Sequence, residues 1–591
     1  MYFTLTKRSV YRNALFIFTA VLFFSCQKEF SINNDNAVLL PDLTTRVSSS
    51  ILGFVTDEND AAVKDATIQF GISTTTSDKY GYFEIKNVQV VKDAAVVTVT
   101  KAGYFKGIKT YMAKEGKAAF FRVKLIPKTT AGSINSTAGG TVTLANGLSI
   151  LLPAGAVVNA ATNATYTGTV NIAAFWINPE AADLNKIMPG DLRGIDKDGS
   201  MKLLKTFGMA AVELTGSSGE LLQIAAGKKA TLTLPIPSSL SATAPSSIPL
   251  WYFDETNGLW KEQGNAVKTG NTYVGEVSHF SFWNWDVPGN YVQFDCTLHD
   301  VSGNPIPYTL ILIHVAGTTN YALGYTDASG YVSGAVPANA QLVLEVFTYY
   351  VCNAPLYTQT FNTTNANISL GVITITSGYT ANISGTVTDC NTNAVTNGYI
   401  IILINGYYTY YPVSNTGTFN FPFSLCTNST AVTLIAEDLT ALQQSSPVNV
   451  NLVPGSNVIG NLQACNNSIA EFLNYSINGT NYSYTAPADS VTYFTDQQTV
   501  YVEANKIGTL NAADLRFAAP GIGLNSSQLL GSFTAPQMQN TIIPNPISVH
   551  ITEYGAVGQF VSGNFTGTFV YFQSPNTVYN VTCNFRVRRT F

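Results

Sequence analysis

Three consecutive residues, His279, Phe280 and Ser281, supply the groups that a self-cleaving peptide bond needs. The Ser281 hydroxyl would attack the Phe280 carbonyl carbon in an N→O acyl shift, and His279 would accept the hydroxyl proton. The reaction also needs a strained backbone at that bond, and three residue types do not reveal strain. The alternative is a plain strand, in which His279 and Ser281 share one face and Phe280 lies on the other. Autoproteolysis between Phe280 and Ser281 is therefore one hypothesis, and ordinary packing is the other.

The N-terminal segment has the pattern of an export signal. Basic residues precede Ala14–Phe24, an apolar run of eleven residues that is too short for a spanning helix of about 20 residues. Ser25 and Cys26 follow at once, so the segment resembles a bacterial lipoprotein signal peptide. This resemblance implies that the Cys26 thiol is lipidated and anchors the chain in a membrane. An ordinary signal peptide with an incidental cysteine is the alternative.

The three residues after the cysteine, Gln27-Lys28-Glu29, bear on the final location. They look like a short tag that sends lipoproteins of some Gram-negative bacteria to the outer face of the outer membrane. The alternative is the start of a solvated linker. We expect a lipid-anchored protein of the cell outer membrane, exposed at the surface.

Composition excludes several classes of protein. The chain has 591 residues, of which 46% are apolar and 11% charged, with a net charge of −5; an average soluble protein is about 25% charged. A nucleic-acid partner is excluded because no excess of Lys and Arg exists to neutralise phosphates. A polytopic membrane protein is excluded because the chain has one long apolar run. Disorder is disfavoured by the high apolar content and low net charge.

The hydrophobic pattern predicts an all-β protein of tandem β-sandwich domains. Short runs of Val, Ile, Thr, Tyr and Phe alternate with Gly, Asn, Asp and Pro turns at a spacing of about ten residues. Ala182–Met188 is the best candidate for a short helix. Trp251 and Trp260 flank Asn257-Gly258, which predicts a hairpin with both indole rings on one core face.

An internal repeat organises much of the chain. Its three copies begin at Gly53–Asp57, His299–Ile306 and Gly385–Asp389, and each continues through a second turn, at Thr76–Phe83, Thr326–Val332 and Ser414–Phe419. Asp or Asn followed by Gly marks tight turns with positive φ. The copies resemble the carboxypeptidase regulatory-like repeat, a seven-stranded prealbumin-like sandwich. That resemblance implies a structural or adhesive module without a catalytic part.

Two other regions have resemblances of their own. Gly139–Ala156 and the closing stretch Ser278–Trp283 resemble a ZU5-type β-sandwich. Related modules cut themselves at a tripeptide like the one at 279–281, and this is the source of the autoproteolysis hypothesis. Phe560–Phe569 and Val581–Arg588 alternate cleanly and resemble a C-terminal β-domain of secreted and lipidated bacterial surface proteins.

These patterns predict seven consecutive segments. They are a signal peptide at 1–25, a flexible tether at 26–49, a first repeat at 50–127, a ZU5-like region at 128–288, a second repeat at 289–377, a third repeat at 378–466 and a C-terminal β-domain at 467–591.

Cysteines suggest disulfides, because an exported chain meets an oxidising compartment. Apart from Cys26, all six lie after residue 290. Their confinement to the C-terminal half favours bridges within the repeats, namely Cys296–Cys352 and one pair drawn from Cys390, Cys426 and Cys465, with buried free thiols as the alternative. The sixth of these cysteines is Cys583.

Other candidate sites are weaker. Asp196-Lys197-Asp198-Gly199 looks like half of a calcium loop, but the closing Glu is absent, so a β-turn is expected and no metal site is predicted. No motif for a cofactor is found. Tyr407, Thr409 and Tyr411 would share one face of a strand, with Tyr408 and Tyr410 on the other. Tyr407 and Tyr411 are the candidates for binding sugar or peptide, and cross-strand packing is the alternative.

Together these observations predict a lipid-anchored β-sandwich rod of the cell envelope that presents a structural, adhesive or ligand-binding surface. A glycan or a protein at the cell surface is the expected ligand. Autoproteolysis and glycan binding as an accessory protein are the alternative functions, and no other enzyme activity is expected.

Overall fold

The computed structural model describes residues 41–591 except 319–320, 348–353, 377–378, 406, 487, 497, 507–511, 539, 556–557, 573 and 590–591. Cys26 and Cys352 lie outside the described residues. In the described part nearly every regular element is a strand, and the helices are α2 (Leu184–Ile187), inside the predicted helical segment, and α3 (Ser238–Ser241). The predicted all-β class with tandem sandwiches is confirmed.

The first repeat is a sandwich of two sheets with strand orders β4-β1-β7 and β3-β2-β5-β6. The first strand is central in its sheet: β1 pairs antiparallel with β4 and parallel with β7. Alternating residues of each strand point into the core between the sheets. The strands are β1 (Arg46–Thr56), β2 (Thr67–Phe70), β3 (Ser73–Thr76), β4 (Tyr82–Val91), β5 (Ala95–Thr100), β6 (Gly107–Tyr111) and β7 (Lys117–Lys124).

The second repeat has the same topology, with sheets β24-β21-β27 and β23-β22-β25-β26 and a parallel pair of β21 with β27. Its strands are β21 (Tyr291–Asp300), β22 (Leu310–Val315), β23 (Tyr321–Tyr325), β24 (Tyr331–Pro337), β25 (Gln341–Phe347), β26 (Tyr357–Asn362) and β27 (Ile368–Ile375).

The third repeat keeps this plan and adds two very short strands. Its sheets are β31-β28-β35 and β30-β29-β32-β33-β36, with β34 also paired to β32, and β28 runs parallel to β35. The strands are β28 (Tyr379–Thr388), β29 (Gly398–Ile404), β30 (Tyr407–Pro412), β31 (Thr418–Leu425), β32 (Thr430–Asp438), β33 (Gln443–Gln444), β34 (Val448–Leu452), β35 (Gly455–Gln463) and β36 (Asn467–Ser468).

One turn recurs at the same place in all three repeats, just before β4, β24 and β31. Its first residue is Asp78, Asp327 or Ser414, whose side-chain oxygen accepts the backbone N–H groups two and four residues later. Three residues after that cap stands a glycine with φ of 74°, 76° or 75°. In the first copy a Cβ on this glycine would lie 2.2 Å from the Val55 carbonyl oxygen, so only glycine fits.

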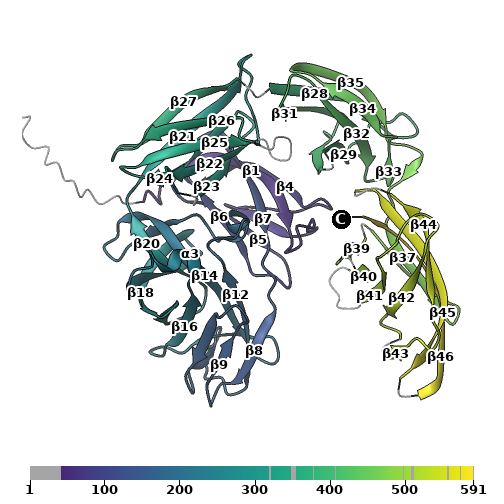
Figure 1. The fold of residues 1–591 in the computed structure, drawn as a ribbon, viewed down its shortest axis with the longest axis horizontal. Coiled ribbons are helices and arrows are strands. Elements are labelled where there is room, and N and C mark those ends of the chain that lie inside the picture. Colours follow the sequence, from purple (N-terminus) through teal and green to yellow (C-terminus); the bar gives the residue numbers. More distant parts are fainter. Residues whose placement is uncertain are drawn as a thin grey trace, which may run out of the picture.

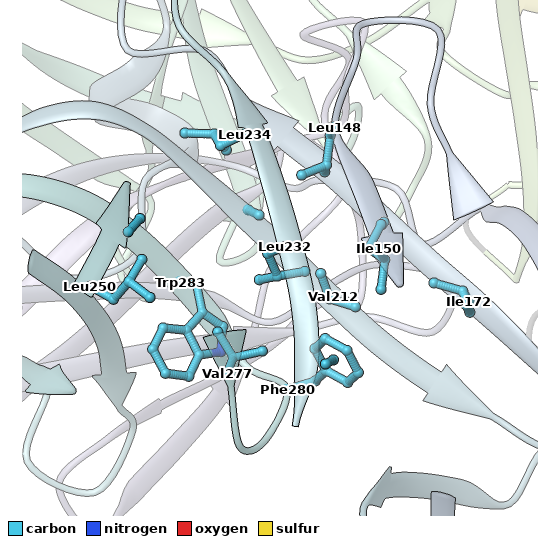
Figure 2. Close-up of a cluster of buried hydrophobic side chains, with 14 of the residues drawn as sticks. Leu148, Ile150, Ile172, Val212, Leu232, Leu234, Leu250, Val277, Phe280 and Trp283 are labelled. Atoms are coloured by element: carbon cyan, nitrogen blue, oxygen red, sulfur yellow. The ribbon is translucent and has the colours of Figure 1, made fainter. Parts of the chain in front are cut away.

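The middle module follows the first repeat in the sequence and precedes the second; it is a thirteen-stranded sheet with one core inside it and a second core that it shares with the first repeat. Figure 2 shows the first of these cores, in which Leu148, Ile150, Val212, Leu232 and Trp283 belong to one cluster of buried side chains. Trp251 and Trp260 lie together in a neighbouring core, on either side of the Asn257-Gly258 turn, as predicted.

The strands of the middle module are β8 (Thr130–Asn135), β9 (Gly140–Thr143), β10 (Ser149–Leu152), β11 (Val157–Asn159), β12 (Thr169–Ile177), β13 (Arg193–Ile195), β14 (Met201–Thr215), β15 (Leu221–Ile224), β16 (Ala230–Pro235), β17 (Ser247–Asp254), β18 (Leu259–Thr269), β19 (Thr272–Val277) and β20 (Phe282–Gly289).

The C-terminal unit is a ten-stranded sheet that also curls around its own core. The two alternating stretches found in the sequence pair with each other as β45 and β46, with Phe565 opposite Cys583. The strands are β37 (Phe472–Ile477), β38 (Thr480–Thr485), β39 (Asp489–Thr495), β40 (Thr499–Lys506), β41 (Ala512–Ala518), β42 (Ser527–Thr534), β43 (Thr541–Ile542), β44 (Ser548–Tyr554), β45 (Phe560–Tyr571) and β46 (Ser574–Arg588).

The chain does not form the predicted rod. In Figure 1 the first repeat lies in the middle, with the other parts arranged around it and the C-terminal unit at the far side. Phe120 of the first repeat packs on Tyr308 and Tyr325 of the second, and Tyr80 packs on Tyr410 of the third. The prediction was wrong because the three repeats carry aromatic side chains on their outer surfaces, and these become buried when the repeats pack on each other.

The disulfide predictions are partly confirmed. Cys390 and Cys465 form a bridge across the third repeat, with Cα atoms 5.0 Å apart, and Cys426 is also disulfide-bonded. The predicted Cys296–Cys352 bridge is wrong, because Cys296 is a free thiol. Cys296 lies on the inward face of β21 with no exposed surface, where it serves as a small core residue. Cys583 is likewise free and buried.

Candidate functional site

A large cavity of the described part lies between the first repeat and its neighbours. It has a volume of about 2770 Å³, and all five sandwich units contribute to its wall. The wall includes Phe280 and Ser281 from the middle module and the whole of strand β30, Tyr407–Pro412. The structure therefore brings the two candidate sites of the sequence to one cavity, although they lie more than 120 residues apart.

The candidate self-cleaving segment is a bend and not a strand, contrary to the alternation predicted for it. Residues 278–281 connect β19 to β20, and the strand begins only at Phe282. Phe280 enters the core of the middle module and Phe282 enters the core shared with the first repeat. The chain leaves the strand here because these two side chains must reach different cores.

Hydrogen bonds hold this bend at several points. The Gln223 side chain accepts from the Phe280 N–H at 2.7 Å and donates to the Phe280 carbonyl at 3.0 Å. The Trp283 indole N–H donates to the His279 carbonyl at 3.0 Å. Burial lowers the pKa of His279, so its imidazole is a neutral base. The Ser281 hydroxyl donates to the Phe282 carbonyl at 3.1 Å and so is turned toward the bond that follows it.

We expect the purified chain to run as one intact band on a denaturing gel. The Ser281 hydroxyl is bonded to the Phe282 carbonyl, and an attack on the Phe280 carbonyl would require it to rotate away. The Ser281→Ala variant should give the same single band. Two fragments that meet at residue 280 in the wild type, and their absence in Ser281→Ala, would show that the bend rearranges and cleaves itself.

The tyrosines of β30 are divided between two packing surfaces. Tyr411 stacks on Phe421 inside the third repeat, with ring centroids 3.9 Å apart. Tyr408 and Tyr410 face the other way, and Tyr410 stacks on Tyr80 of the first repeat at 4.1 Å. Tyr407 is 49% exposed. Tyr407 and Tyr411 thus do not form one exposed aromatic platform, and most of this strand is used for packing.

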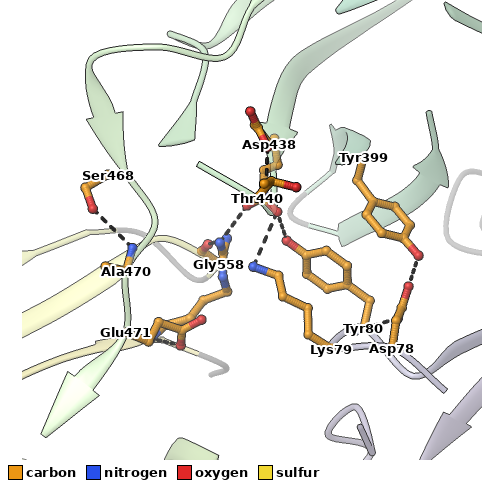
Figure 3. Close-up of polar contacts among 12 residues, drawn as sticks. Asp78, Lys79, Tyr80, Tyr399, Asp438, Thr440, Ser468, Ala470, Glu471 and Gly558 are labelled. Carbon is orange, nitrogen blue, oxygen red and sulfur yellow. Dashed lines mark hydrogen bonds and ion pairs between the residues drawn. The ribbon is translucent and has the colours of Figure 1, made fainter. Parts of the chain in front are cut away.

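Three parts of the chain meet beside these tyrosines, at what we call the Tyr80 junction. The first repeat supplies the turn Asp78–Tyr80, the third repeat supplies Tyr399, Tyr410 and Glu437, and the C-terminal unit supplies Arg588. Figure 3 shows Lys79 and Tyr80 pointing toward strand β32 while Asp78 meets Tyr399.

Glu437 is the centre of the junction. Its side chain has no exposed surface. It accepts hydrogen bonds from Tyr80 and from Arg588, the latter at 2.7 Å, and Lys79 lies 3.5 Å away. Burial acts to raise the pKa of Glu437, but Arg588, Lys79 and the Tyr80 hydroxyl outweigh it and hold that pKa below its ordinary value. Glu437 is therefore ionised at neutral pH.

Asp78 titrates differently. Its carboxylate accepts the N–H groups of Tyr80 and Tyr82 and the hydroxyl of Tyr399. Burial nevertheless raises the pKa of Asp78 to about 6, against the opposing effect of the two N–H groups and Lys79. Two acids of one junction thus have pKa values shifted in opposite directions.

No motif in the sequence predicts the Tyr80 junction. One signal was present: the turn position occupied by Tyr80 holds Ser329 in the second repeat and Thr416 in the third. A large aromatic at a turn that otherwise takes small polar residues indicates a contact with another surface. Nothing local indicates which surface this is.

The acidic turn at Asp196 is a β-turn, as predicted. One Asp196 oxygen accepts the N–H groups of Asp198 and Ser200, and Gly199 has φ of 83°. Asp57 caps its turn in the same way. In each turn one carboxylate oxygen holds the backbone.

Comparison with known proteins gives distant likenesses only. No family model matches the chain. It is 28% identical over 155 residues to human cartilage intermediate layer protein 2, which covers 24% of this chain and 13% of that protein. The mouse protein is 29% identical over 106 residues, covering 18% and 9%. The chain thus spans a small part of these curated relatives.

Solved structures were also compared. The Bacillus anthracis TIE protein is 9% identical, over 71% of this chain and 51% of that one, with a TM-score of 0.15. The shaft pilin SpaA of Lactobacillus rhamnosus GG is 11% identical, over 30% and 100%, with a TM-score of 0.18. The major pilin BcpA of Bacillus cereus is 9% identical, over 71% and 100%, with a TM-score of 0.12. These scores are too low to carry an argument. Within the described residues, no helix has the length and apolar character to cross a bilayer.

Proposed function

We propose that this chain is a lipid-anchored protein of the outer cell surface with a structural or adhesive role and no catalytic function. The observation that carries the anchor is the Ser25-Cys26 pair directly after an eleven-residue apolar run. The sandwich units that follow supply a rigid scaffold, and we take the segment boundaries predicted from the sequence as the limits of its folding units.

The binding part of the proposal rests on the large cavity. Its wall combines aromatic rings with charged side chains of both signs, among them Tyr104, Lys101, Arg122 and Glu213. Ligand sites are typically concave and largely apolar, with a few polar groups that fix orientation. A surface glycan or protein segment that enters between the first repeat and its neighbours is the proposed ligand.

We expect a Cys26→Ser variant to move from the membrane fraction to the soluble fraction almost completely. Without the thiol no acyl chain is attached, and each buried methylene of such a chain contributes about 0.8 kcal/mol of membrane binding. Mass spectrometry of the N-terminal peptide and fractionation of cells measure this directly. A Cys296→Ser variant is the matched control and should stay in the membrane fraction. A wild-type chain with an unmodified Cys26 in the soluble fraction would contradict the proposal.

Surface exposure needs a separate measurement. Protease added to intact cells should degrade the chain if it faces outward. Protection of the chain in intact cells, together with its degradation after the outer membrane is opened, would place it on the inner face.

A further inference from the structure

The Tyr80 junction joins parts of the chain that are far apart in sequence. Tyr80 and Glu437 are separated by 357 positions, and Glu437 and Arg588 by 151. Among the three equivalent turns, the one in the first repeat has a cap residue that contacts another unit. This cap is Asp78, and its carboxylate accepts a hydrogen bond from the Tyr399 hydroxyl of the third repeat. The Asp327 carboxylate accepts from Ser329 and Tyr331 in its own turn. In the third copy the cap is the Ser414 hydroxyl.

We propose that the Tyr80 junction is a pH-sensitive latch, which holds the third repeat and C-terminal unit on the first repeat more tightly in mildly acidic than in neutral solution. Residues on both sides of the latch line the large cavity, among them Asp78, Tyr80, Tyr410 and Arg588. Release of the latch therefore widens the opening of that cavity.

The acid response comes from Asp78. When the units separate, its carboxyl returns to water but still accepts the two N–H groups of its own turn, so its pKa falls to the ordinary value of 3.8 or below. When they dock, the pKa is about 6. When the pKa of a group is higher in the docked state, its full contribution to docking is present at any pH below its undocked pKa. This contribution is lost as the pH rises through its docked pKa. With these two pKa values, the equilibrium constant for docking is about tenfold larger at pH 5 than at pH 7.

Glu437 sets the acid limit of the latch. The pKa of Glu437 is lower in the docked state. Its contribution to docking is therefore fully present at a pH above its ordinary pKa of 4.5, and it is lost as the pH falls through its docked pKa. Docking is therefore tightest at a pH below the titration of docked Asp78 and above that of docked Glu437.

The charged and titratable groups around these two acids come from every element packed at the junction. They are Lys79, Tyr80 and Tyr82 from the first repeat, Tyr399, Tyr408 and Tyr410 from the third, and Glu471 and Arg588 at and beyond the start of the C-terminal unit. Burial, followed by the effect of neighbouring Glu437, raises the pKa of Tyr80 far above its ordinary value, and burial likewise raises that of Tyr410 to about 12. The pH response of docking therefore rests on Asp78 and Glu437.

The test is a distance measurement between spin labels on the first repeat and the C-terminal unit of the purified full chain. Thr74→Cys and Thr566→Cys are exposed attachment points on strands β3 and β45. In the described part the native cysteines are buried as free thiols or disulfide-bonded, so they do not compete for label. Double electron–electron resonance should show one short distance at pH 4.5. The ratio of the longer distance to the short one should rise about tenfold between pH 5 and pH 7.

Two substitutions separate the latch from a general effect of pH. Asp78→Ser keeps a cap of the kind Ser414 provides and should remove the change between pH 5 and pH 7. Asp327→Ser, the matched change in the second repeat, should leave the change intact. Tyr399→Phe keeps both the turn and its carboxyl, and should increase the long-distance population at pH 4.5. A distance distribution that is the same at pH 4.5 and 7.5, or a pH response that persists in Asp78→Ser, overturns the proposal.

The latch and the proposed function fail separately. Loss of the lipid anchor leaves the distance between the labels unchanged. A chain that binds no surface ligand can still open and close with pH.

Discussion

A Glu437→Ala variant is expected to lose about 3–5 kcal/mol of the free energy that holds the third repeat and C-terminal unit to the first repeat. The wild-type carboxylate has no exposed surface, and its partner Arg588 is 13% exposed. Removal of the carboxylate leaves the Arg588 guanidinium buried without its anion. The Tyr80 hydroxyl loses its acceptor in the same change. Equilibrium urea unfolding followed by circular dichroism and tyrosine fluorescence should show an earlier first transition.

An exposed ion pair provides the control. Lys229 and Glu276 are 2.9 Å apart, but their side chains are 59% and 60% exposed. Such pairs contribute about 0–1 kcal/mol, so Glu276→Ala should leave the unfolding curve almost unchanged. The shift of the unfolding curve for Glu437→Gln should lie between the shifts for Glu437→Ala and Glu276→Ala. The amide oxygen can accept a hydrogen bond from Tyr80, but the amide does not neutralise the charge of Arg588. Equal shifts for Glu437→Ala and Glu276→Ala would mean that the junction does not hold the units together.

The second large effect is expected at Trp251, where alanine should destabilise the middle module by about 3–5 kcal/mol. The indole ring is fully buried, and it packs so closely on Gly194 that a Cβ there would lie 2.9 Å from the ring. Its N–H donates to the Asp286 carbonyl at 3.2 Å, and this carbonyl would lose its partner. Near-ultraviolet circular dichroism during thermal unfolding measures the loss.

Two further variants provide comparisons for the stability loss expected in Trp251→Ala. Trp251→Phe keeps most of the ring volume and should cost less than Trp251→Ala, because a smaller cavity forms. Val267→Ala changes a side chain of the same module that is 57% exposed, and it should change stability by no more than about 0.5 kcal/mol. A Trp251→Ala protein as stable as the wild type would show that this core relaxes to fill the cavity.

Local patterns in the sequence were sufficient to predict the sandwiches. The turns at Asp78 and Asp327 need an oxygen cap and a glycine with positive φ, and both requirements appear as residue types at fixed spacing. Strand alternation follows from burial of one face, as in β1 and β25. The Trp251–Trp260 hairpin was also predictable from local sequence, because its two paired strands follow each other directly in the chain and are joined by one short turn.

The contacts between sandwiches could not be predicted in this way. Whether Tyr80 packs on Tyr410, or Phe120 on Tyr308, depends on how the units are oriented, and no spacing in the sequence specifies that orientation. The bend at 278–281 was missed because its alternation also fits a strand, and only the presence of two separate cores decides the matter. The pairing of Cys296 failed because proximity in space is not visible in spacing along the chain.

The parallel pairing of the first and last long strands in each repeat has a mechanical consequence. In the first repeat β1 and β7 pair in register over eight positions, from Ser49 with Lys117 to Thr56 with Lys124. Tension applied to the two ends of such a repeat pulls these strands lengthwise past each other. The bonds of the ladder are then loaded together instead of one after another. A pulling force must therefore break the whole ladder in a single event, which makes the repeat resistant to stretching.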